Sequence, residues 1–201
     1  MQYFTFLGVG TLPEGYEEAL YSFEDNKEEI HASKYVQSAI IEKFQSDISE
    51  VFVFCTEKSY SLGARNIKNE IKTKFNIDIK FITINEFVKI EEILQKMNEV
   101  LKEDFIIDVT HSFRNIPISV TMISNYLEVS TKKQLKHLFY GNYNRETNEG
   151  LIIDLINQYE NSKIASSLMA FDQFLKISDT YLYNLNDNKI KTPSSLKRKN
   201  P

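Results

Sequence analysis

Cysteine and histidine are scarce in this chain, and the scarcity of each excludes a kind of site. The 201 residues include one cysteine, Cys55, so no disulfide can form within the chain, as is typical of a reducing cytoplasm. The three histidines, His31, His111 and His137, have no Cys-x2-Cys or H-x3-H neighbours, so the sequence predicts no metal site. No stretch reaches the roughly 18 uninterrupted apolar residues of a membrane helix. We therefore expect a cytoplasmic protein with no membrane segment, metal or cofactor.

Glycine is also sparse, and its spacing disfavours the common nucleotide-binding motifs. Gly8, Gly10 and Gly15 follow a β-rich segment as G-x-G-x4-G, which differs from the dinucleotide fingerprint G-x-G-x-x-G. The chain contains neither the Gly-Lys-Ser/Thr of a P-loop nor the G-x-S-x-G elbow of a hydrolase. The glycines are either turn residues or a place where backbone approaches a phosphate or base, with Thr11 as an added donor.

The charge is unevenly distributed along the chain. Five of the 24 basic residues lie in the tail at 189–201, which has no acid, so residues 1–188 hold 19 basic and 28 acidic side chains. Binding of long nucleic acid depends on many Lys/Arg contacts to phosphates. An acidic body is therefore not expected to bind long nucleic acid along its surface, whereas a small anion in one pocket remains compatible with it.

Short β-rich segments alternate with amphipathic helical segments. The predicted strands are 2–8, 50–55, 77–83 and 104–109. The predicted helices are 33–46, 60–74, 88–102 and 113–130. This alternation is typical of βαβ units, and it predicts an α/β fold with a Rossmann-like, doubly wound, mostly parallel sheet and flanking helices.

Two segments interrupt this alternation. Residues 19–32 predict a β-hairpin that turns at Asp25-Asn26 and is inserted after the first strand. Residues 134–156 predict two strands joined by a polar turn, which we expect to form an antiparallel hairpin at the edge of the sheet.

The remaining residues suggest how the chain is organised. Helical spacing returns at 160–185, and the last dozen residues have the composition of a linker. We expect a ligand-binding core at 1–159, a connector helix region at 160–188 and a flexible basic tail at 189–201.

The densest polar cluster follows the fourth predicted strand, in DFIIDVTHSFRNIPIS. Ligands of open parallel sheets bind outside the carboxyl ends of the strands, where helix N-termini favour anions. Capping could explain the hydroxyls, but a cation such as Arg114 is disfavoured near the positive end of a helix unless an anion joins it. The candidate residues are Asp108, Thr110, His111, Ser112, Arg114 and Asn115.

A second polar loop follows the second predicted strand, in CTEKSYSLGARN. Thr56, Lys58 and Ser59 would lie at the same edge of the sheet. They could cap the next helix or face a ligand, and the sequence leaves both interpretations open.

These segments resemble a known family. FLGVGTLPEGY, DVTHSFRNIP, LFYGNYN and LIIDL are similar to segments of the CARF domain (CRISPR-associated Rossmann fold), in particular that of Csx-type accessory proteins of type III CRISPR systems. The resemblance covers about residues 1–185, and DVTHSFRNIP, close to the pattern D-[IV]-T-H-G-[FL]-R, is its specific part. Ser112 stands where the family usually has Gly, and Asn144 stands at a usually acidic position of YGA-x-E.

The resemblance implies a homodimer that binds cyclic oligoadenylate, a ring-shaped second messenger, at its two-fold axis. It favours a ring of four adenylates over one of six, and a sensor role in antiviral signalling. It implies an effector domain C-terminal to or associated with this chain, although CARF-only proteins are the alternative. The implied ligand-binding residues are Gly8, Gly10, Thr11, Thr56, Lys58, Ser59, Asp108, Thr110, His111, Ser112, Arg114, Asn115, Tyr140 and Gly141.

The resemblance also leaves open an enzymatic role. Some CARF domains are ring nucleases, which cleave the messenger without metal through attack of its own 2′-OH and leave a 2′,3′-cyclic phosphate. In that alternative the candidate catalytic residues are His111, Lys58, Ser59 and Thr11, with Arg114 stabilising phosphate charge.

Overall fold

The computed structural model describes residues 1–9, 16–86, 88–111 and 116–187. The chain divides into two units, Met1–Tyr159 and Glu160–Pro201. The strands are β1 (Gln2–Leu7), β2 (Ala19–Phe23), β3 (Asn26–Ser33), β4 (Glu50–Cys55), β5 (Ile79–Thr83), β6 (Phe105–Asp108), β7 (Leu135–Asn144) and β8 (Glu149–Asp154). The helices are α1 (Val36–Lys43), α2 (Glu57–Phe75), α3 (Ile90–Val100), α4 (Ile116–Thr131) and α5 (Ile156–Asp187).

The first unit contains one eight-stranded sheet in the order β3-β2-β8-β7-β6-β1-β4-β5. β1 lies between β6 and β4 and pairs in parallel with both. β4 pairs in parallel with β5, and β6 with β7. The predicted α/β class and the doubly wound, mostly parallel sheet are therefore confirmed.

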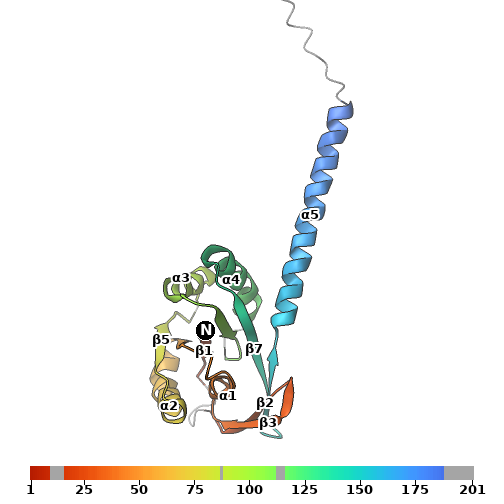
Figure 1. Cartoon of the computed structure of the whole chain (residues 1–201). Coiled ribbons are helices and arrows are strands. Elements are labelled where there is room, and N and C mark those ends of the chain that lie inside the picture. Colours follow the sequence, from red (N-terminus) through yellow and green to blue (C-terminus); the bar gives the residue numbers. More distant parts are fainter. Residues whose placement is uncertain (10–15, 87, 112–115, 188–201) are drawn as a thin grey trace, which may run out of the picture. The chain divides into compact units, whose positions relative to one another are not determined.

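Helices cover both faces of the parallel part of the sheet, and the alternation of side chains explains the two cores. Val51, Val53 and Cys55 on β4 face the core formed with α1 and α2. Phe52 and Phe54, between them in sequence, face the core formed with α3 and α4. Figure 1 shows α1 and α2 on one side of the sheet and α3 and α4 on the other. Cys55 is buried, as expected for a small apolar residue.

Both predicted hairpins are present, but one prediction about their placement is wrong. β2 and β3 are antiparallel, and so are β7 and β8. The β7–β8 hairpin does not lie at the sheet edge, because β2 pairs in parallel with the outer side of β8 and makes β3 the edge strand. This pairing satisfies backbone groups that an edge would leave open, as in the bond from Glu24 N to Ile152 O (2.9 Å).

The start of α2 is earlier than the periodicity predicted, at Glu57 rather than at residue 60. The cause is a capping box. The Thr56 side chain accepts from the backbone N of Ser59 (3.1 Å), and the Ser59 side chain accepts from the backbone N of Thr56 (2.9 Å). A prediction from apolar periodicity misses a first helical turn that is made of polar residues.

The second unit begins within α5. The backbone N of Ile156, at the start of this helix, donates to Oδ1 of Asp154 (3.0 Å), and Asp154 Oδ2 lies 2.6 Å from Nδ1 of His137. His137 therefore has a structural partner at the end of β8. Within the described ranges, none of the helices has both the length and the apolar content to cross a membrane.

Substitution of Gly150 by alanine tests the unexpected pairing of β2 with β8. A Cβ at Gly150 would lie 2.3 Å from Cδ1 of Tyr21 on β2, so ring and strand would have to separate. We expect Gly150→Ala to lower the free energy of unfolding by about 1–3 kcal/mol, measured by chemical denaturation. In Gly63→Ala, the control on α2, the new Cβ would lie no closer than 3.4 Å to Leu7, so this change should raise stability by up to about 1 kcal/mol. A Gly150→Ala variant as stable as the wild type would contradict the geometry.

Candidate functional site

The topology contains a switch point beside β1. The chain that leaves β1 passes through the β2–β3 hairpin and reaches α1 on one face of the sheet, whereas the chain that leaves β6 reaches α4 on the other face. Parallel sheets bind ligands in the crevice outside the strand ends at such a point. Here one side of the crevice is formed by Gly8 and Val9, which follow β1. The other side is formed by residues 109–111, which follow β6.

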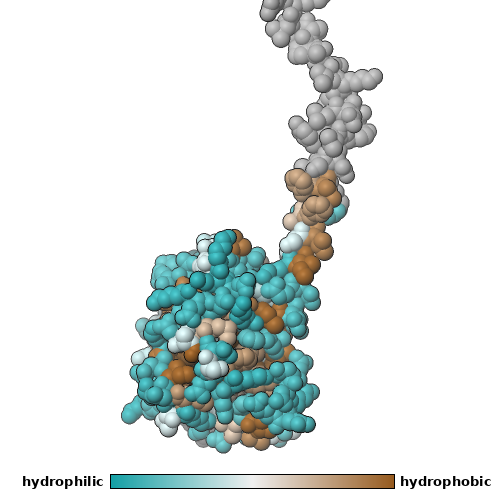
Figure 2. Space-filling model, in the orientation of Figure 1, coloured by the Kyte–Doolittle hydropathy of each residue, from teal (hydrophilic) through white to brown (hydrophobic). Residues whose placement is uncertain are grey.

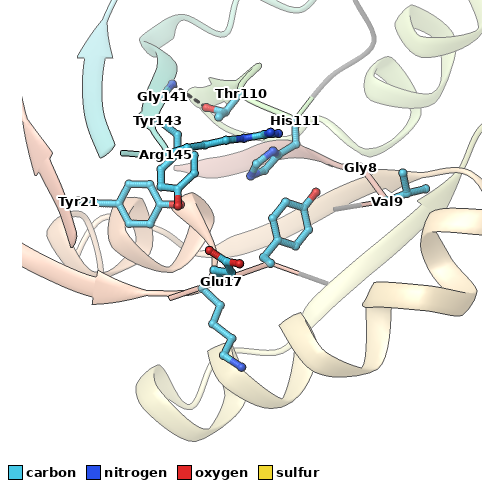
Figure 3. Close-up of a pocket in the computed structure, with 11 residues that line it drawn as sticks. Gly8, Val9, Glu17, Tyr21, Thr110, His111, Gly141, Tyr143 and Arg145 are labelled. Carbon is cyan, nitrogen blue, oxygen red and sulfur yellow. Dashed lines mark hydrogen bonds between the residues drawn. The ribbon is translucent and has the colours of Figure 1, made fainter. Parts of the chain in front are cut away.

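A cavity of about 470 Å³ opens at this place. Figure 3 shows side chains from several separate segments directed toward one space. The lining residues are Gly8, Val9, Tyr16, Glu17, Tyr21, Lys34, Thr110, His111, Gly141, Tyr143 and Arg145.

Asp108 supports the floor of the site from below. Its side chain is fully buried at the end of β6. One carboxylate oxygen, Oδ2, accepts from the hydroxyl of Thr5 (2.7 Å) and more weakly from that of Tyr3 (3.4 Å). The other, Oδ1, accepts from the backbone N of Thr110 (2.9 Å) and from the Thr110 hydroxyl. Four hydrogen bonds balance the buried charge, so Asp108 acts as a structural anchor for the loop after β6.

Thr110 links the Asp108 carboxylate to β7. Its hydroxyl donates to Asp108 and accepts from the backbone N of Gly141 (2.7 Å), the bond drawn dashed in Figure 3. A Cβ at Gly141 would lie 3.0 Å from Cγ2 of Thr110 and 3.1 Å from Cγ2 of Val36, so these side chains would have to move by a few tenths of an ångström. Glycine at position 141 therefore favours the close approach of β7 to the β6 loop.

His111 is the polar side chain with unused hydrogen-bonding capacity in the site. Its Nε2 is buried and has no hydrogen-bond partner among the residues that the structure describes. Its ring packs against that of Tyr16, with centroids 4.7 Å apart. Burial lowers the pKa of His111 below its ordinary value of 6.5, and the Asp108 carboxylate partly opposes the shift. His111 is therefore a neutral imidazole at pH 7, able to donate or accept a proton.

Two cations face the cavity. Lys34 follows β3, and Arg145 lies in the turn after β7. Neither has a salt-bridge partner within the described part of the chain, although the acidic Glu17 also lines the cavity. With His111 neutral, the lining carries one net positive charge in a strongly acidic body. This arrangement suits an anionic ligand.

Tyrosines supply the apolar surface of the cavity. Tyr21 is buried, and burial together with the nearby Tyr143 raises the pKa of Tyr21 to about 12, so its hydroxyl stays protonated. Tyr143 is partly exposed, and its hydroxyl donates to Oδ1 of Asn148 (2.7 Å). Together with Tyr16, these rings can pack against planar groups of a ligand.

A second cavity, of about 500 Å³, adjoins the first. Gly8, Val9 and His111 line both cavities, so His111 lies in the wall that the two share. The second cavity is bounded on its other side by the start of α2, including Lys58. It is also lined by Phe6, Leu7, Phe54, Thr56, Ser59 and Glu86.

The structure brings many of the predicted site residues together. Gly8, Thr110, His111 and Gly141 line the first cavity. Lys58 lines the second, as do Thr56 and Ser59, whose hydroxyls already bond within the cap of α2. Gly10, Thr11, Ser112, Arg114 and Asn115 lie outside the described residues.

Asp108 and Tyr140 line neither of these two cavities. Asp108 lies beneath Thr110, and Tyr140 alternates along β7 with the cavity-lining Gly141 and Tyr143, so its side chain points to the opposite face.

Sequence reasoning missed the residues that the two hairpins contribute. Tyr21 lies on β2, Lys34 directly follows β3, and Tyr143 and Arg145 belong to the β7–β8 hairpin. A usable signal was present on β7, because Gly141, Tyr143 and Arg145 are two residues apart and share one face if the strand pattern continues into the turn. No comparable signal links Tyr21 and Lys34 to the switch point.

The chain matches no protein-family model and none of the curated proteins. The functional argument therefore depends on the residues and their geometry.

The environment of His111 predicts its titration. We expect its ring, followed by NMR, to titrate below pH 6.5, and Asp108→Asn to lower that pKa further by removing the carboxylate that raises it. Below about pH 6.5 the unfolded chain binds more protons at this site than the folded chain. The contribution of neutral His111 to the free energy of unfolding is therefore fully present above about pH 6.5. It is lost as the pH falls through the pKa that His111 has in the folded chain. Titration of His111 at or above 6.5 would contradict a buried, uncompensated imidazole.

Proposed function

We propose that the protein is a sensor of cyclic oligoadenylate, with one part of the ring bound in the cavity of each protomer of a homodimer. Ligand binding would regulate an effector that belongs to the same protein or associates with it. The observation that carries this proposal is the cavity at the β1/β6 switch point. Two cations with no salt bridge to a described residue, a neutral histidine whose Nε2 has no described hydrogen-bond partner, and three tyrosines line this one space.

The chemistry of the lining suits the parts of a nucleotide. Lys34 and Arg145 offer N–H donors and positive charge to phosphate oxygens. Tyr143 and Tyr16 offer ring surfaces to adenine. Nε2 of His111, which is buried and has no partner among the described residues, could bond a ribose hydroxyl or a phosphate if the ring turns toward the ligand. The acidic body limits long nucleic acids, since they require cations along an extended surface.

The size of the cavity supports a shared ligand. A volume of about 470 Å³ lies within the roughly 300–1,000 Å³ typical of pockets for drug-sized molecules, and this corresponds to about one or two nucleotides. A ring of four adenylates would need the cavities of two protomers. A ring with even symmetry matches an isologous dimer, in which each copy contributes the same residues.

The outer face of α4 supports the dimer. Met122, Tyr126 and Val129 are spaced by four and three residues, so they share one face of the helix, and each is more than half exposed. α4 begins at the sheet edge where the site lies, because it follows β6. Two copies could pair through this exposed apolar face.

A second candidate function, cleavage of the ring, is favoured by the placement of His111 between two cavities. In this reaction the ligand's 2′-oxygen attacks the adjacent phosphorus while the 5′-oxygen leaves, which gives a 2′,3′-cyclic phosphate and a 5′-hydroxyl. A neutral His111 can take the proton of the 2′-hydroxyl, and Lys58 in the second cavity can stabilise charge on the phosphate. The Ser59 hydroxyl is a weaker candidate, since it bonds within the α2 cap.

Ligand binding gives the direct test of the sensor. We expect cyclic tetra-adenylate to raise the melting temperature, and Arg145→Ala and Lys34→Ala each to weaken binding by about 10–100-fold, because each loses a charge-assisted hydrogen bond. The loss should shrink at high salt. Binding is measured by calorimetry, with cyclic hexa-adenylate and linear tetra-adenylate compared.

The matched control is Arg65→Ala, which removes an exposed arginine from α2 that lines neither cavity. It should bind as the wild type does. The proposal fails if none of the cyclic nucleotides binds, or if Arg145→Ala and Lys34→Ala both bind normally.

Chromatography of the nucleotides after incubation separates the sensor from the nuclease. If the ring is cleaved, His111→Gln should slow cleavage by about 10²–10⁴-fold, the range for loss of a general acid or base, and Lys58→Ala should slow it less. Intact ligand after long incubation with the wild type would leave the sensor function alone.

A further inference from the structure

The described part of α5 in the second unit exposes large apolar side chains along its length. Figure 2 shows these residues in brown on the helix. Leu168 is 63% exposed and Phe171 is 59% exposed. Several large apolar side chains exposed next to one another often mark a surface that binds a partner. The exposed set is Ile164, Leu168, Met169, Phe171, Phe174 and Leu175.

Four of these residues form a narrow seam. Ile164, Leu168, Phe171 and Leu175 are separated by four, three and four residues, which is the alternation of the a and d positions of a heptad. At 100° per residue they fall within an arc about 60° wide. Phe174 lies at a g position beside this seam and Met169 lies outside it; apolar residues at successive a and d positions are typical of a coiled coil. The seam therefore indicates another helix as its partner.

The positions beside the seam favour a second copy of this chain. Partner choice between different coiled-coil chains is usually set by opposite charges at the e and g positions. Here Ala165 and Asp172 occupy e, and Ser167 and Phe174 occupy g, so a single charged residue flanks the seam. Nothing in this set selects a chain of complementary charge, and two identical helices meet without a row of like charges.

The polar face argues against a lipid surface as the partner. Helices that lie on membranes carry many Lys and Arg residues on the polar side and a broad apolar side. Between residues 160 and 175 the only cation is Lys163, which pairs with Glu160 (Nζ to Oε1, 3.0 Å). The other polar residues in this range are three serines, Asn161, Asp172 and Gln173. This composition offers little attraction to anionic headgroups.

We infer that α5 pairs with α5 of a second copy through the seam of Ile164, Leu168, Phe171 and Leu175 as a two-stranded coiled coil. The pairing is independent of the ligand proposed for the first unit. It would provide a dimer contact besides the face of α4.

Cysteine crosslinking on the full chain tests this pairing. Ile164→Cys, Leu168→Cys and Leu175→Cys place thiols in the seam, and Ser166→Cys and Gln173→Cys place them on the opposite face as controls. The native Cys55 contributes little background, because it is buried and burial raises its pKa to about 11. After mild oxidation we expect several-fold more covalent dimer for the seam variants than for the controls on a non-reducing gel.

The direction of the helices follows from the same variants. Self-linked Ile164→Cys and Leu175→Cys indicate parallel helices, and links that form only when these two variants are mixed indicate antiparallel helices; either pattern supports the pairing. Equal crosslinking of seam and control positions, or none at any position, overturns it. Flotation of the wild type with vesicles containing phosphatidylserine, without crosslinks in the seam, would assign the face to a membrane surface instead.

A charge in the seam separates this inference from the proposed function. Leu168→Asp, added to whichever of the seam cysteine variants or mixtures gives the crosslink, should abolish it, whereas Gln173→Asp in the same background should not. Calorimetry with cyclic tetra-adenylate on both variants reports on the first unit separately. Absence of nucleotide binding with crosslinks intact would refute the proposed function alone, and normal binding without crosslinks would refute the coiled coil alone.

Discussion

The buried carboxylate of Asp108 is the constraint on which the site depends. A charge without access to water is tolerated only when hydrogen bonds surround it, and here Thr5, Tyr3 and Thr110 provide them from β1 and from the loop after β6. Because the same Thr110 hydroxyl holds the backbone of Gly141, three strands are fixed to one another at their carboxyl ends. The position of His111, the residue after Thr110, follows from that fixation. The edge of the sheet that carries the candidate site is therefore held by hydrogen bonds where these strands meet.

Within the part of the chain that the structure describes, the cations of the site are not held by hydrogen bonds of the kind that fix Asp108 and Thr110. Lys34 and Arg145 come from the ends of the two hairpins, have no salt-bridge partner among the described residues and are exposed to solvent. Solvated cations on long side chains can adjust to the phosphates of the ligand that we propose, whereas the anchored loop would hold a fixed position beside it. A fixed floor with adaptable cations is suited to recognition of a flexible, multiply charged molecule.

Much of the fold could be predicted from the sequence, and the reasons for success and failure are physical. The spacing of apolar residues within segments such as 50–55 and 60–74 indicates which face of each strand or helix is buried. The strands, the helices and the class of the sheet could therefore be predicted. The pairing of β2 with β8 was not, because backbone hydrogen bonds between distant segments leave no periodic trace. The same gap hid the contribution of Tyr21 and Lys34 to the cavity. Polar residues near strand ends, such as Thr110 and His111, were found because parallel strands bring their ends to one edge; that Asp108 lies below the cavity depends on its bonds to Thr5 and Tyr3, which only the structure reveals.

The partner of β2 also has a consequence for the order of folding. The side-chain amide of Asn148 donates a hydrogen bond to the backbone carbonyl of Glu18, 130 residues earlier in the chain. The backbone hydrogen bonds between β2 and β8 likewise form only after β8 has been synthesised. Contacts so distant in sequence form late, because the entropy of closing the loop must be met first. During synthesis the β2–β3 hairpin therefore remains without its neighbour until the ribosome has released residues 149–154. The polar and charged residues Asn26, Lys27, Glu28 and Glu29 at the start of β3 disfavour pairing of the other open edge of this hairpin with nascent chains, whereas the edge of β2 stays open until β8 arrives.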